Sequence, residues 1–164
     1  MEVEMKRREM VEMWGTMKQF SDEKLSKKFI FAMAINESRV DDDVQAVILA
    51  QKPADSYSEY EKKRMDILFI HAETGDNDQV AIDNSHVRIK PENIDIVRSE
   101  LKELDDEYRD VLDERNADLV DFGELLESTT IVDIQMVSYD DLPDEISKND
   151  YMALKPMIEI NEEG

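Results

Sequence analysis

The chain has 164 residues, of which 41% are hydrophobic and 37% charged, and its formal net charge is −21. This length is that of one ordinary domain and is sufficient to bury a core. The sequence contains no cysteine, which excludes disulfides, zinc–thiolate centres and cysteine nucleophiles. The excess of acids makes free nucleic acid and anionic membranes unsuitable partners, because their phosphates would be repelled.

Only four glycines and four prolines are available for turns, which favours a few long helices over an all-β sandwich. The acids are unevenly spread, since residues 1–28 hold seven basic and six acidic side chains and the net negative charge lies beyond them. No apolar run approaches the roughly 20 residues of a membrane span, and the charged first dozen residues do not resemble a signal peptide. We therefore expect a soluble protein of the cytoplasm.

The first 20 residues are expected to form an N-terminal helix. The apolar residues that recur in it at helical spacing are Val3, Met10, Trp14 and Met17. Two roles are open for this segment. In the favoured one it closes the core of its own domain, because an unburied Trp and Met stripe would promote aggregation. In the other it docks on a neighbouring subunit and gives a homodimer, with its basic side chains facing the partner's acidic helix.

Helical patterns follow as far as His71. Ser21, which precedes two acids, has the properties of an N-cap, and an apolar helix face begins after it. Three consecutive carboxylates at residues 41–43 suggest that a further helix starts there. Pro53 is expected to end this segment, since proline lacks an N–H and clashes with the preceding turn. One more amphipathic helix is predicted from Tyr57 to His71.

Beta structure is predicted in two places. Residues 74–79, "TGDNDQ", have the composition of a turn, and "QVAIDNSHVRIK" at 79–90 shows two short β-prone runs, which is typical of a hairpin. "TTIVDIQMV" at 129–137 is a strand candidate that could add to this hairpin. The C-terminal segments "DDLPDEI" and "NDYMALKPMIEI" predict two short helices. We expect one α+β domain over residues 1–164, mostly helical, with long antiparallel, coiled-coil-like helices and a small antiparallel β-hairpin or sheet.

A long acidic helix is predicted over residues 91–127. Pro91 suits the first position of a helix, and apolar residues recur at steps of three and four from Ile94 to Leu126. A helix of about 35 residues is about 50 Å long. Its part at 99–127, "SELKELDDEYRDVLDERNADLVDFGELLE", contains twelve carboxylates and only three basic side chains. Such self-repulsion needs an explanation.

A line of acids without intervening bases runs along this predicted helix at successive i,i+4 positions, at Asp106, Asp110, Glu114 and Asp118. Each like-charged pair costs a helix about 0.2–0.5 kcal/mol. Burial of the apolar stripe, at about 1.5–3 kcal/mol per large side chain, outweighs that cost. The helix can therefore fold, but folding alone does not require the acids. Three explanations are open: a solvated face that maintains solubility, adaptation to high salt, and a surface that imitates the phosphate backbone of nucleic acid.

Charge density limits the third explanation. Duplex DNA carries a charge about every 1.7 Å of its axis, whereas this helix carries about one net charge per 5 Å. The helix alone is a poor imitation, and a dimer would improve it. If the acids bind a partner, the candidate partner-binding residues are Asp106, Asp110, Glu114, Asp118 and Asp121.

Signals of catalysis are weak. No glycine-rich phosphate loop, HExxH pair or nucleophile elbow is present. His71 precedes Glu73, Asp76 and Asp78, but their spacing does not match an EF-hand loop, and His86 lies in the predicted hairpin. We therefore predict a protein that is not an enzyme and has no cofactor or metal. Asn36 lies on an otherwise apolar helix face, where a satisfied buried amide is the ordinary interpretation and contact with a ligand the alternative.

Four segments together resemble a group of small uncharacterised proteins encoded by tailed phages. They are "KKFIFAMAINES", "QKPADSYSEYEKKRMDILFIHAETGDN", "LDDEYRDVLDE" and "DDLPDEI", and the resemblance spans roughly residues 1–158. It implies a viral origin, with the protein acting as a virion or assembly component or as an early protein that acts on the host. No functional residue is transferred from this group.

These observations lead to three hypotheses. The first is an acidic interaction protein of phage type that binds a basic host protein in the host cytoplasm and inhibits a nucleic-acid-binding or defence enzyme. The second is a virion or assembly role, suggested by the heptad-like spacing of Leu101, Leu104, Tyr108 and Val111. The third is a metal-assisted hydrolase that uses His71 and nearby acids.

Overall fold

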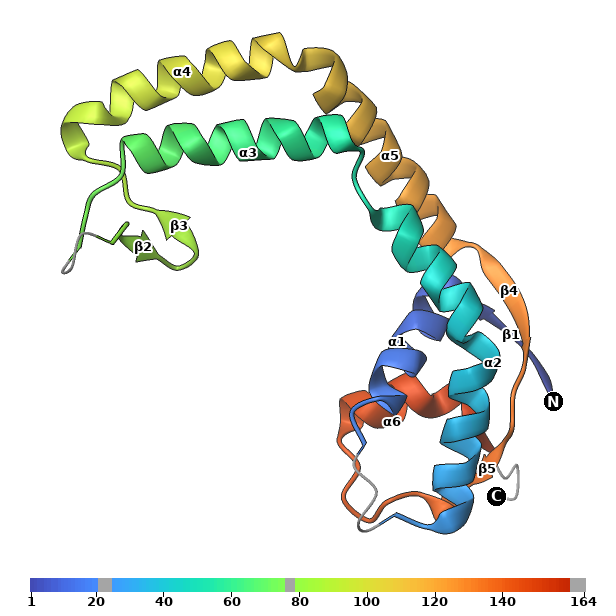
Figure 1. The fold of residues 1–164 in the computed structure, drawn as a ribbon. Helices are drawn as coiled ribbons and strands as arrows, with labels where there is room; N and C mark the ends of the chain where they lie inside the picture. The colour runs from blue at the N-terminus through green and yellow to red at the C-terminus, as the bar shows by residue number, and fades with distance from the viewer. Residues whose placement is uncertain (21–24, 76–78, 160–164) are drawn as a thin grey trace. The chain divides into compact units, whose positions relative to one another are not determined.

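The computed structural model describes residues 1–20, 25–75 and 79–159. Within these ranges the fold is α+β and mostly helical with small two-stranded sheets, as predicted (Figure 1). One domain is expected from the sequence, and the chain divides into two compact units. They are Met1–Lys52 together with Asp121–Gly164, and Pro53–Val120. Helix α5 (Arg109–Glu127) begins in the second unit and ends in the first.

The first unit contains three helices besides the end of α5, two short two-stranded sheets and two 3₁₀ turns within the described residues. In chain order its elements are β1 (Glu2–Lys6), α1 (Arg7–Met17), α2 (Lys27–Gln51), β4 (Thr129–Asp133), β5 (Val137–Ser138), η3 (Tyr139–Asp141), α6 (Lys148–Leu154), η4 (Lys155–Met157) and β6 (Ile158–Glu159). Strands β1 and β4 pair antiparallel, whereas β5 and β6 pair parallel.

The predicted helix over the first 20 residues is wrong for residues 2–6, which form β1. "EVEMK" alternates polar and apolar residues, and this period of two places Val3 and Met5 on one face of a strand. The partner of β1 is β4, in which Val132 is likewise buried and lies opposite Val3. The strand predicted within residues 129–137 is therefore present, but its expected addition to the hairpin is wrong.

Helix α2 is one continuous helix of 25 residues. It begins after Ser26, whose Oγ accepts a hydrogen bond from the backbone N–H of Phe29 (3.1 Å). The predicted N-cap, Ser21, lies outside the described residues. The helix start predicted at residues 41–43 is wrong, because Val40 and Val44 are buried on the face that already carries Phe29. Pro53 follows the helix end, as predicted.

The core of the first unit is built mainly from one face each of α1 and α2 and from the C-terminal segment. Its most completely buried side chains are Met10, Met13, Phe29, Asn36, Val40, Val44, Ile134, Leu154 and Met157. The helix predicted for "DDLPDEI" is wrong: only the 3₁₀ turn η3 forms there, and Leu142 before Pro143 is extended. The segment "NDYMALKPMIEI" forms α6, then η4, then β6, so its prediction as a helix holds only for the first part.

The second unit is a helical hairpin with a β-hairpin. In chain order its elements are α3 (Asp55–Ile70), β2 (Ile82–Asp83), β3 (His86–Val87), η2 (Pro91–Asn93) and α4 (Ile94–Glu107), followed by the first part of α5. Helices α3 and α4 lie side by side and antiparallel (Figure 1), and Tyr60, Val97 and Leu104 are buried between them.

The predicted β-hairpin is confirmed, with a two-residue turn. Asp83 pairs with His86, and the φ angles of Asn84 and Ser85 are 46° and 66°. Two successive residues in this left-handed region make a type I′ turn, whose twist matches that of paired strands. Pro91 occupies the first turn of η2, consistent with its predicted position at a helix start.

The predicted single helix over 91–127 is interrupted at Tyr108. This residue has φ −101° and ψ 20°, and α4 ends before it while α5 begins after it. Its ring packs on Tyr60 of α3 with 5.7 Å between ring centroids, and its hydroxyl donates to Glu59 (3.2 Å). These contacts with α3 hold Tyr108 away from regular helical geometry. After this interruption, α5 runs continuously from Arg109 to Glu127.

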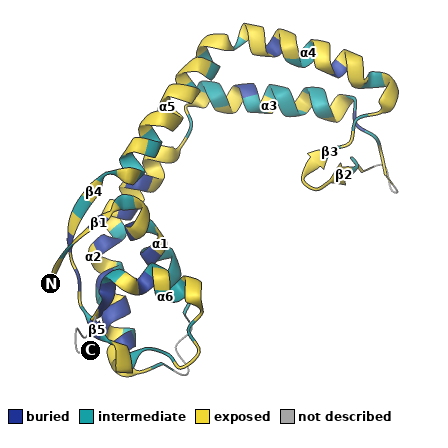
Figure 2. Ribbon diagram, turned by 180° about the vertical axis from the view of Figure 1, so that it is seen from behind, coloured by how far each residue is buried: buried dark blue, intermediate teal, exposed yellow. Residues whose placement is uncertain are grey.

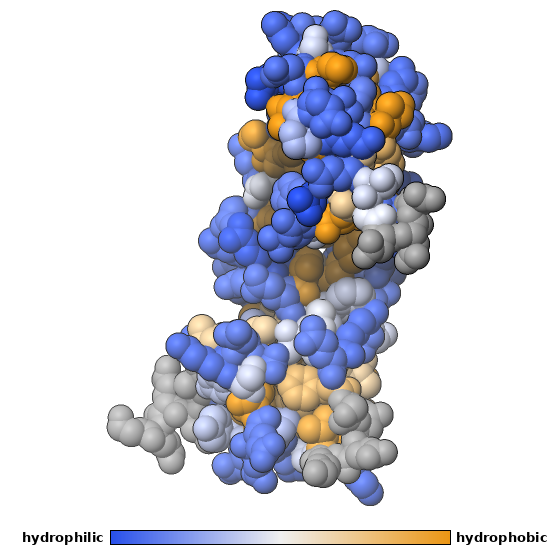
Figure 3. Space-filling model, turned by 90° about the vertical axis from the view of Figure 1, so that its left-hand side faces the viewer, coloured by the Kyte–Doolittle hydropathy of each residue, from blue (hydrophilic) through white to orange (hydrophobic). Residues whose placement is uncertain are grey.

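Helices α4 and α5 expose most of their residues, and α5 has no buried residue (Figure 2). The face of the molecule in Figure 3 is largely hydrophilic, with small apolar areas. No helix among the described residues has the length and apolar character needed to cross a membrane.

Candidate partner-binding surface

All five acids predicted to bind a partner are exposed. Asp106 lies in the last turn of α4, and Asp110, Glu114 and Asp118 lie on α5, all within the second unit. Asp121 follows on α5 in the first unit. The structure therefore places the predicted line of acids on two helices instead of one. We call Asp110, Glu114 and Asp118 the acidic ridge.

The acids at the end of α4 have partners within the second unit. Asp105, Asp106 and Glu107 crowd the C-terminal turn, which contains no basic residue and where the helix dipole disfavours negative charge. Asp105 accepts a hydrogen bond from the hydroxyl of Tyr60 (2.7 Å), Asp106 pairs with Arg109, and Glu107 lies 3.8 Å from Nζ of Lys63. Asp106 is thus already engaged with Arg109.

The pKa of Tyr60 is shifted by its position beside these acids. Its hydroxyl is buried against α4 and donates to a carboxylate, and both the burial and the hydrogen bond to Asp105 raise the pKa of Tyr60 to about 12. The phenol therefore stays protonated at pH values above its ordinary pKa, and it can still donate its hydrogen bond to Asp105 there.

The acidic ridge lacks such compensation. None of its three carboxylates forms an ion pair with a basic side chain in the part of the chain that the structure describes. They stand at successive i,i+4 positions of a regular helix, so each neighbouring pair costs α5 about 0.2–0.5 kcal/mol. Asp110 lies in the first turn of α5, where the helix dipole offsets part of that cost.

Two of the ridge acids also have a local structural role. Glu114 and Asp118 line a narrow hollow with Ala54 and Ser56, at the start of α3. Ala54 is the N-cap of α3 and offers no side-chain acceptor. Nearby carboxylates therefore stabilise the N-terminal end of that helix, where the helix dipole is positive. Asp110 does not line this hollow. Its structural contribution is in the first turn of α5, where it favours the positive end of the helix dipole.

The histidines make separate contacts. His71 Nε2 lies 2.8 Å from a carboxylate oxygen of Glu100, and His86 Nδ1 lies 2.8 Å from the carbonyl oxygen of Asn84. No group of three His, Cys, Asp or Glu side chains suited to a metal occurs within residues 1–20, 25–75 and 79–159. Asp76 and Asp78, which the sequence analysis considered beside His71, lie outside those ranges.

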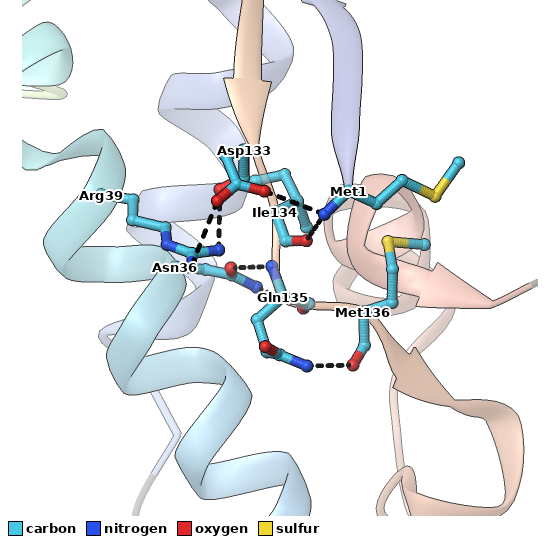
Figure 4. Close-up of polar contacts among 7 residues, drawn as sticks. All are labelled: Met1, Asn36, Arg39, Asp133, Ile134, Gln135 and Met136. Carbon is cyan, nitrogen blue, oxygen red and sulfur yellow. Dashed lines mark hydrogen bonds and ion pairs between the residues drawn. The ribbon is translucent and has the colours of Figure 1, made fainter.

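Asn36 is a satisfied buried amide, as its ordinary interpretation predicted. Its Nδ2 donates to the carbonyl oxygen of Gln135 (2.9 Å), and its Oδ1 accepts from the backbone N–H of the same residue (2.7 Å) (Figure 4). Nearby, Asp133 accepts from the N-terminal amine (2.9 Å) and lies 3.2 Å from Arg39. These contacts lower the pKa of Asp133, first through the hydrogen bond from the amine.

The basic residues of the first 20 positions contact their own chain. Lys6 pairs with Glu127 at 2.7 Å, and Arg8 pairs with the same carboxylate. The hydrogen bond from Lys6 and the charge of Arg8 lower the pKa of Glu127. Trp14 donates from Nε1 to Asp41 (3.0 Å), and three methionines of α1 are buried. This segment therefore packs into the core of its own unit.

The sequence analysis missed a groove in the first unit. It lies along β1, α1 and the segment from α6 to η4, and its volume is about 940 Å³. Carboxylates of Glu4, Glu9, Glu12 and Asp150 line it. No local pattern predicts how its walls come together, because α6 lies more than 130 residues after α1 in the chain. The signal that was available is Gly15, an isolated glycine inside a helix.

Comparison of the chain with protein-family models, with curated proteins and with solved structures finds no match. The resemblance to phage proteins therefore stays a prediction from the sequence.

Proposed function

We propose that the protein is a non-enzymatic interaction protein that binds a basic surface of a partner protein through the acidic ridge. One observation supports the proposal above all: three exposed carboxylates on one helix face have no cationic partner among the described residues. Asp106 and Asp121 extend the acidic character of the chain on either side of the ridge in sequence.

The chemistry of the partner follows from the ridge. An exposed row of carboxylates attracts lysine and arginine side chains and speeds their encounter at low salt. Surfaces rich in those residues are typical of nucleic-acid-binding proteins. A nucleic-acid-binding or defence protein of a host cell is therefore the proposed partner, in line with the phage resemblance. The protein would block access of nucleic acid to that surface.

The virion or assembly role gains no added support. The stripe that suggested it is used inside the second unit, since Leu104 is buried and Tyr108 packs on Tyr60 of α3. The hydrolase hypothesis likewise rests only on His71, which pairs with Glu100.

The test is capture of partners from a bacterial lysate with matched charge variants. Asp110→Lys, Glu114→Lys and Asp118→Lys together remove the acidic ridge. The control, Asp66→Lys, Glu92→Lys and Glu103→Lys, changes the net charge equally at exposed acids of the same unit. We expect the wild type and the control to retain the same basic proteins and the ridge variant to lose them. Circular dichroism checks that helix content is unchanged.

Glu114 and Asp118 also stabilise the N-terminal end of α3, so replacing them could disturb that helix. Asp110→Lys alone provides a second variant that leaves this hollow intact. We expect it to weaken capture without lowering the melting temperature. If the control variant loses capture as strongly as the ridge variant, binding depends on net charge alone and the proposal is wrong. Capture that no ridge variant changes contradicts the proposal as well.

A further inference from the structure

The groove of the first unit brings together an open strand edge, a row of acids and a helix glycine. Its walls are β1, α1 and the segment from α6 to η4, and these elements belong to one compact unit. Three independent features of this groove point to the same kind of occupant.

The first feature is the edge of β1. In an antiparallel pair, residues alternate between those that exchange backbone hydrogen bonds with the partner strand and those whose N–H and C=O point away from it. Met1 and Ile134 exchange both bonds at 2.8 Å, and Arg7 donates to Ser128 at 3.0 Å. Every second residue from Met1 to Arg7 therefore faces β4. The backbone groups of Glu2, Glu4 and Lys6 point outward.

Of these outward groups, only those of Lys6 are used. Its N–H donates to the carboxylate of Glu9 (2.8 Å), in the capping box of α1. The N–H and C=O groups of Glu2 and Glu4 have no backbone partner within the described part of the chain, because the sheet of β1 and β4 has only two strands there. Glu4 lines the groove, so this open edge borders it.

The other edge of the same sheet is capped at its two ends. On β4, the outward carbonyl of Thr129 accepts from Arg7 Nη1 (3.2 Å) and that of Asp133 accepts from Arg39 Nη1 (3.1 Å). Exposed strand edges favour pairing with other chains, and covering them is the usual protection. Arginine side chains thus cover two carbonyls of the β4 edge, whereas the outward groups of Glu2 and Glu4 on β1 have no such cover.

The second feature is charge. Glu4, Glu9, Glu12 and Asp150 line the groove, against Lys155 as the single basic residue of the lining. Apolar residues, including Val3 and Met152, also line it. A lining of this kind complements an extended segment that carries lysine or arginine together with apolar side chains.

The third feature is Gly15. It lies in the last turn of α1 and lines the groove. A Cβ atom added there would meet nothing within 4 Å. No neighbouring atom of the described chain requires a glycine at this position. The space above Gly15 is available to an approaching backbone.

We propose that this groove binds an extended basic segment of a partner protein, which adds to the edge of β1 as a third strand. The segment would exchange backbone hydrogen bonds with Glu2 and Glu4, pass over Gly15, and place its cations against the groove carboxylates. The acidic ridge takes no part in this proposal, which holds or fails independently of the proposed function.

The test uses a labelled octapeptide of alternating lysine and valine as the probe, with binding measured by fluorescence anisotropy. A second peptide, N-methylated at its four central peptide bonds, keeps the same charges but cannot pair as a strand. We expect the wild-type protein to bind the first peptide about tenfold or more tightly than the second. Equal binding of both peptides would overturn strand addition, and absence of binding to the first would overturn the proposal as a whole.

Two matched glycine variants locate the site. Gly15→Leu fills the groove, whereas Gly123→Leu places the same side chain on α5, where an added Cβ likewise meets nothing within 4 Å and the groove is not lined. Both should stay folded, as thermal melting will show. We expect Gly15→Leu to weaken peptide binding about tenfold or more and Gly123→Leu to leave it unchanged. Unchanged binding by Gly15→Leu contradicts the proposal.

A second copy of the chain is the competing occupant. If sedimentation shows a dimer that Gly15→Leu dissociates, the groove serves self-association and the basic-segment proposal is wrong. A monomer that binds the octapeptide supports it.

Discussion

At the scale of single residues, one buried amide joins the two ends of the first unit's sequence. Asn36 of α2 pairs with both backbone groups of Gln135, as a neighbouring strand would. It is the one polar side chain among the buried residues of the described chain, and its exposed fraction is 0%. Helix α2 and the segment after β4 are thereby locked in register.

Asn36→Leu should therefore destabilise the protein. The new side chain keeps the volume but leaves the N–H and C=O of Gln135 without partners, and each such loss costs about 1–3 kcal/mol. We expect the free energy of unfolding to fall by about 2–4 kcal/mol in urea denaturation. Ser38→Ala, at an exposed position of the same helix, is the control. A loss below about 0.5 kcal/mol for Asn36→Leu, the size typical of surface substitutions, would show that the amide is not a structural clamp.

At the scale of elements, the α3–α4 hairpin depends on a tyrosine that donates across it. Tyr60 of α3 is buried and its hydroxyl donates to Asp105, in the acidic last turn of α4. Lys63 of α3 supports the same turn through Glu107. The acids at this helix end are tolerated because α3 supplies the partners.

The stability of this hairpin should depend on pH in the alkaline range. The pKa of Tyr60 is raised from 10.0 to about 12 in the folded protein. Its contribution is therefore fully present below about pH 10. It is lost as the pH rises toward 12, because the unfolded chain ionises first. We expect the melting temperature to fall over this range, and to fall less in Tyr60→Phe. Identical pH profiles for the two proteins would contradict this role of the hydroxyl.

Local patterns predicted the elements that depend on local chemistry. The end of α2 before Pro53 and the hairpin turn at Asn84 follow from proline and turn chemistry within a few residues. The strand at residues 2–6 was missed, because Val3 and Met10 are seven residues apart and fit a helical stripe as well as a strand followed by a helix. The interruption at Tyr108 was missed because its cause, the packing on Tyr60, lies in another helix.

The candidate site was predictable only in those features that local sequence patterns determine. Its acids are exposed, as a helix face without apolar residues suggests. The sequence could not show that Asp106 is paired while Asp110 is not, or that Glu114 approaches the start of α3. These differences arise from contacts between helices, which periodicity along one helix does not contain.

At the scale of the whole molecule, the chain forms two compact units with different contents. The first has most of the buried side chains, the β1–β4 and β5–β6 pairs and the groove. The second has few buried residues and the acidic ridge. In the first unit, basic side chains near the N-terminus form ion pairs and hydrogen bonds with Glu127 and the adjacent Ser128.

Deletion of residues 1–20 should therefore destabilise the protein without changing its oligomeric state. The deletion removes β1 and α1, and with them Met10, Met13 and Met17 from the core. We expect a sharp fall in melting temperature and the same mass per particle in light scattering at moderate salt. A dimer that becomes a stable monomer on deletion would instead show that this segment joins subunits.

The central claim is that a partner recognises the uncompensated carboxylates of the acidic ridge and not the net charge of −21. Its most direct test measures the affinity for a purified captured partner at two salt concentrations. The variants replace carboxylates by uncharged amides. The ridge variant is Asp110→Asn, Glu114→Gln and Asp118→Asn, and the control is Asp66→Asn, Glu92→Gln and Glu103→Gln. Exposed ion pairs contribute about 0.2–1 kcal/mol each. We therefore predict an affinity about tenfold weaker for the ridge variant at low salt, with a smaller dependence on salt, and an unchanged affinity for the control. Equal losses in the two variants, or an unchanged ridge variant, would contradict the claim.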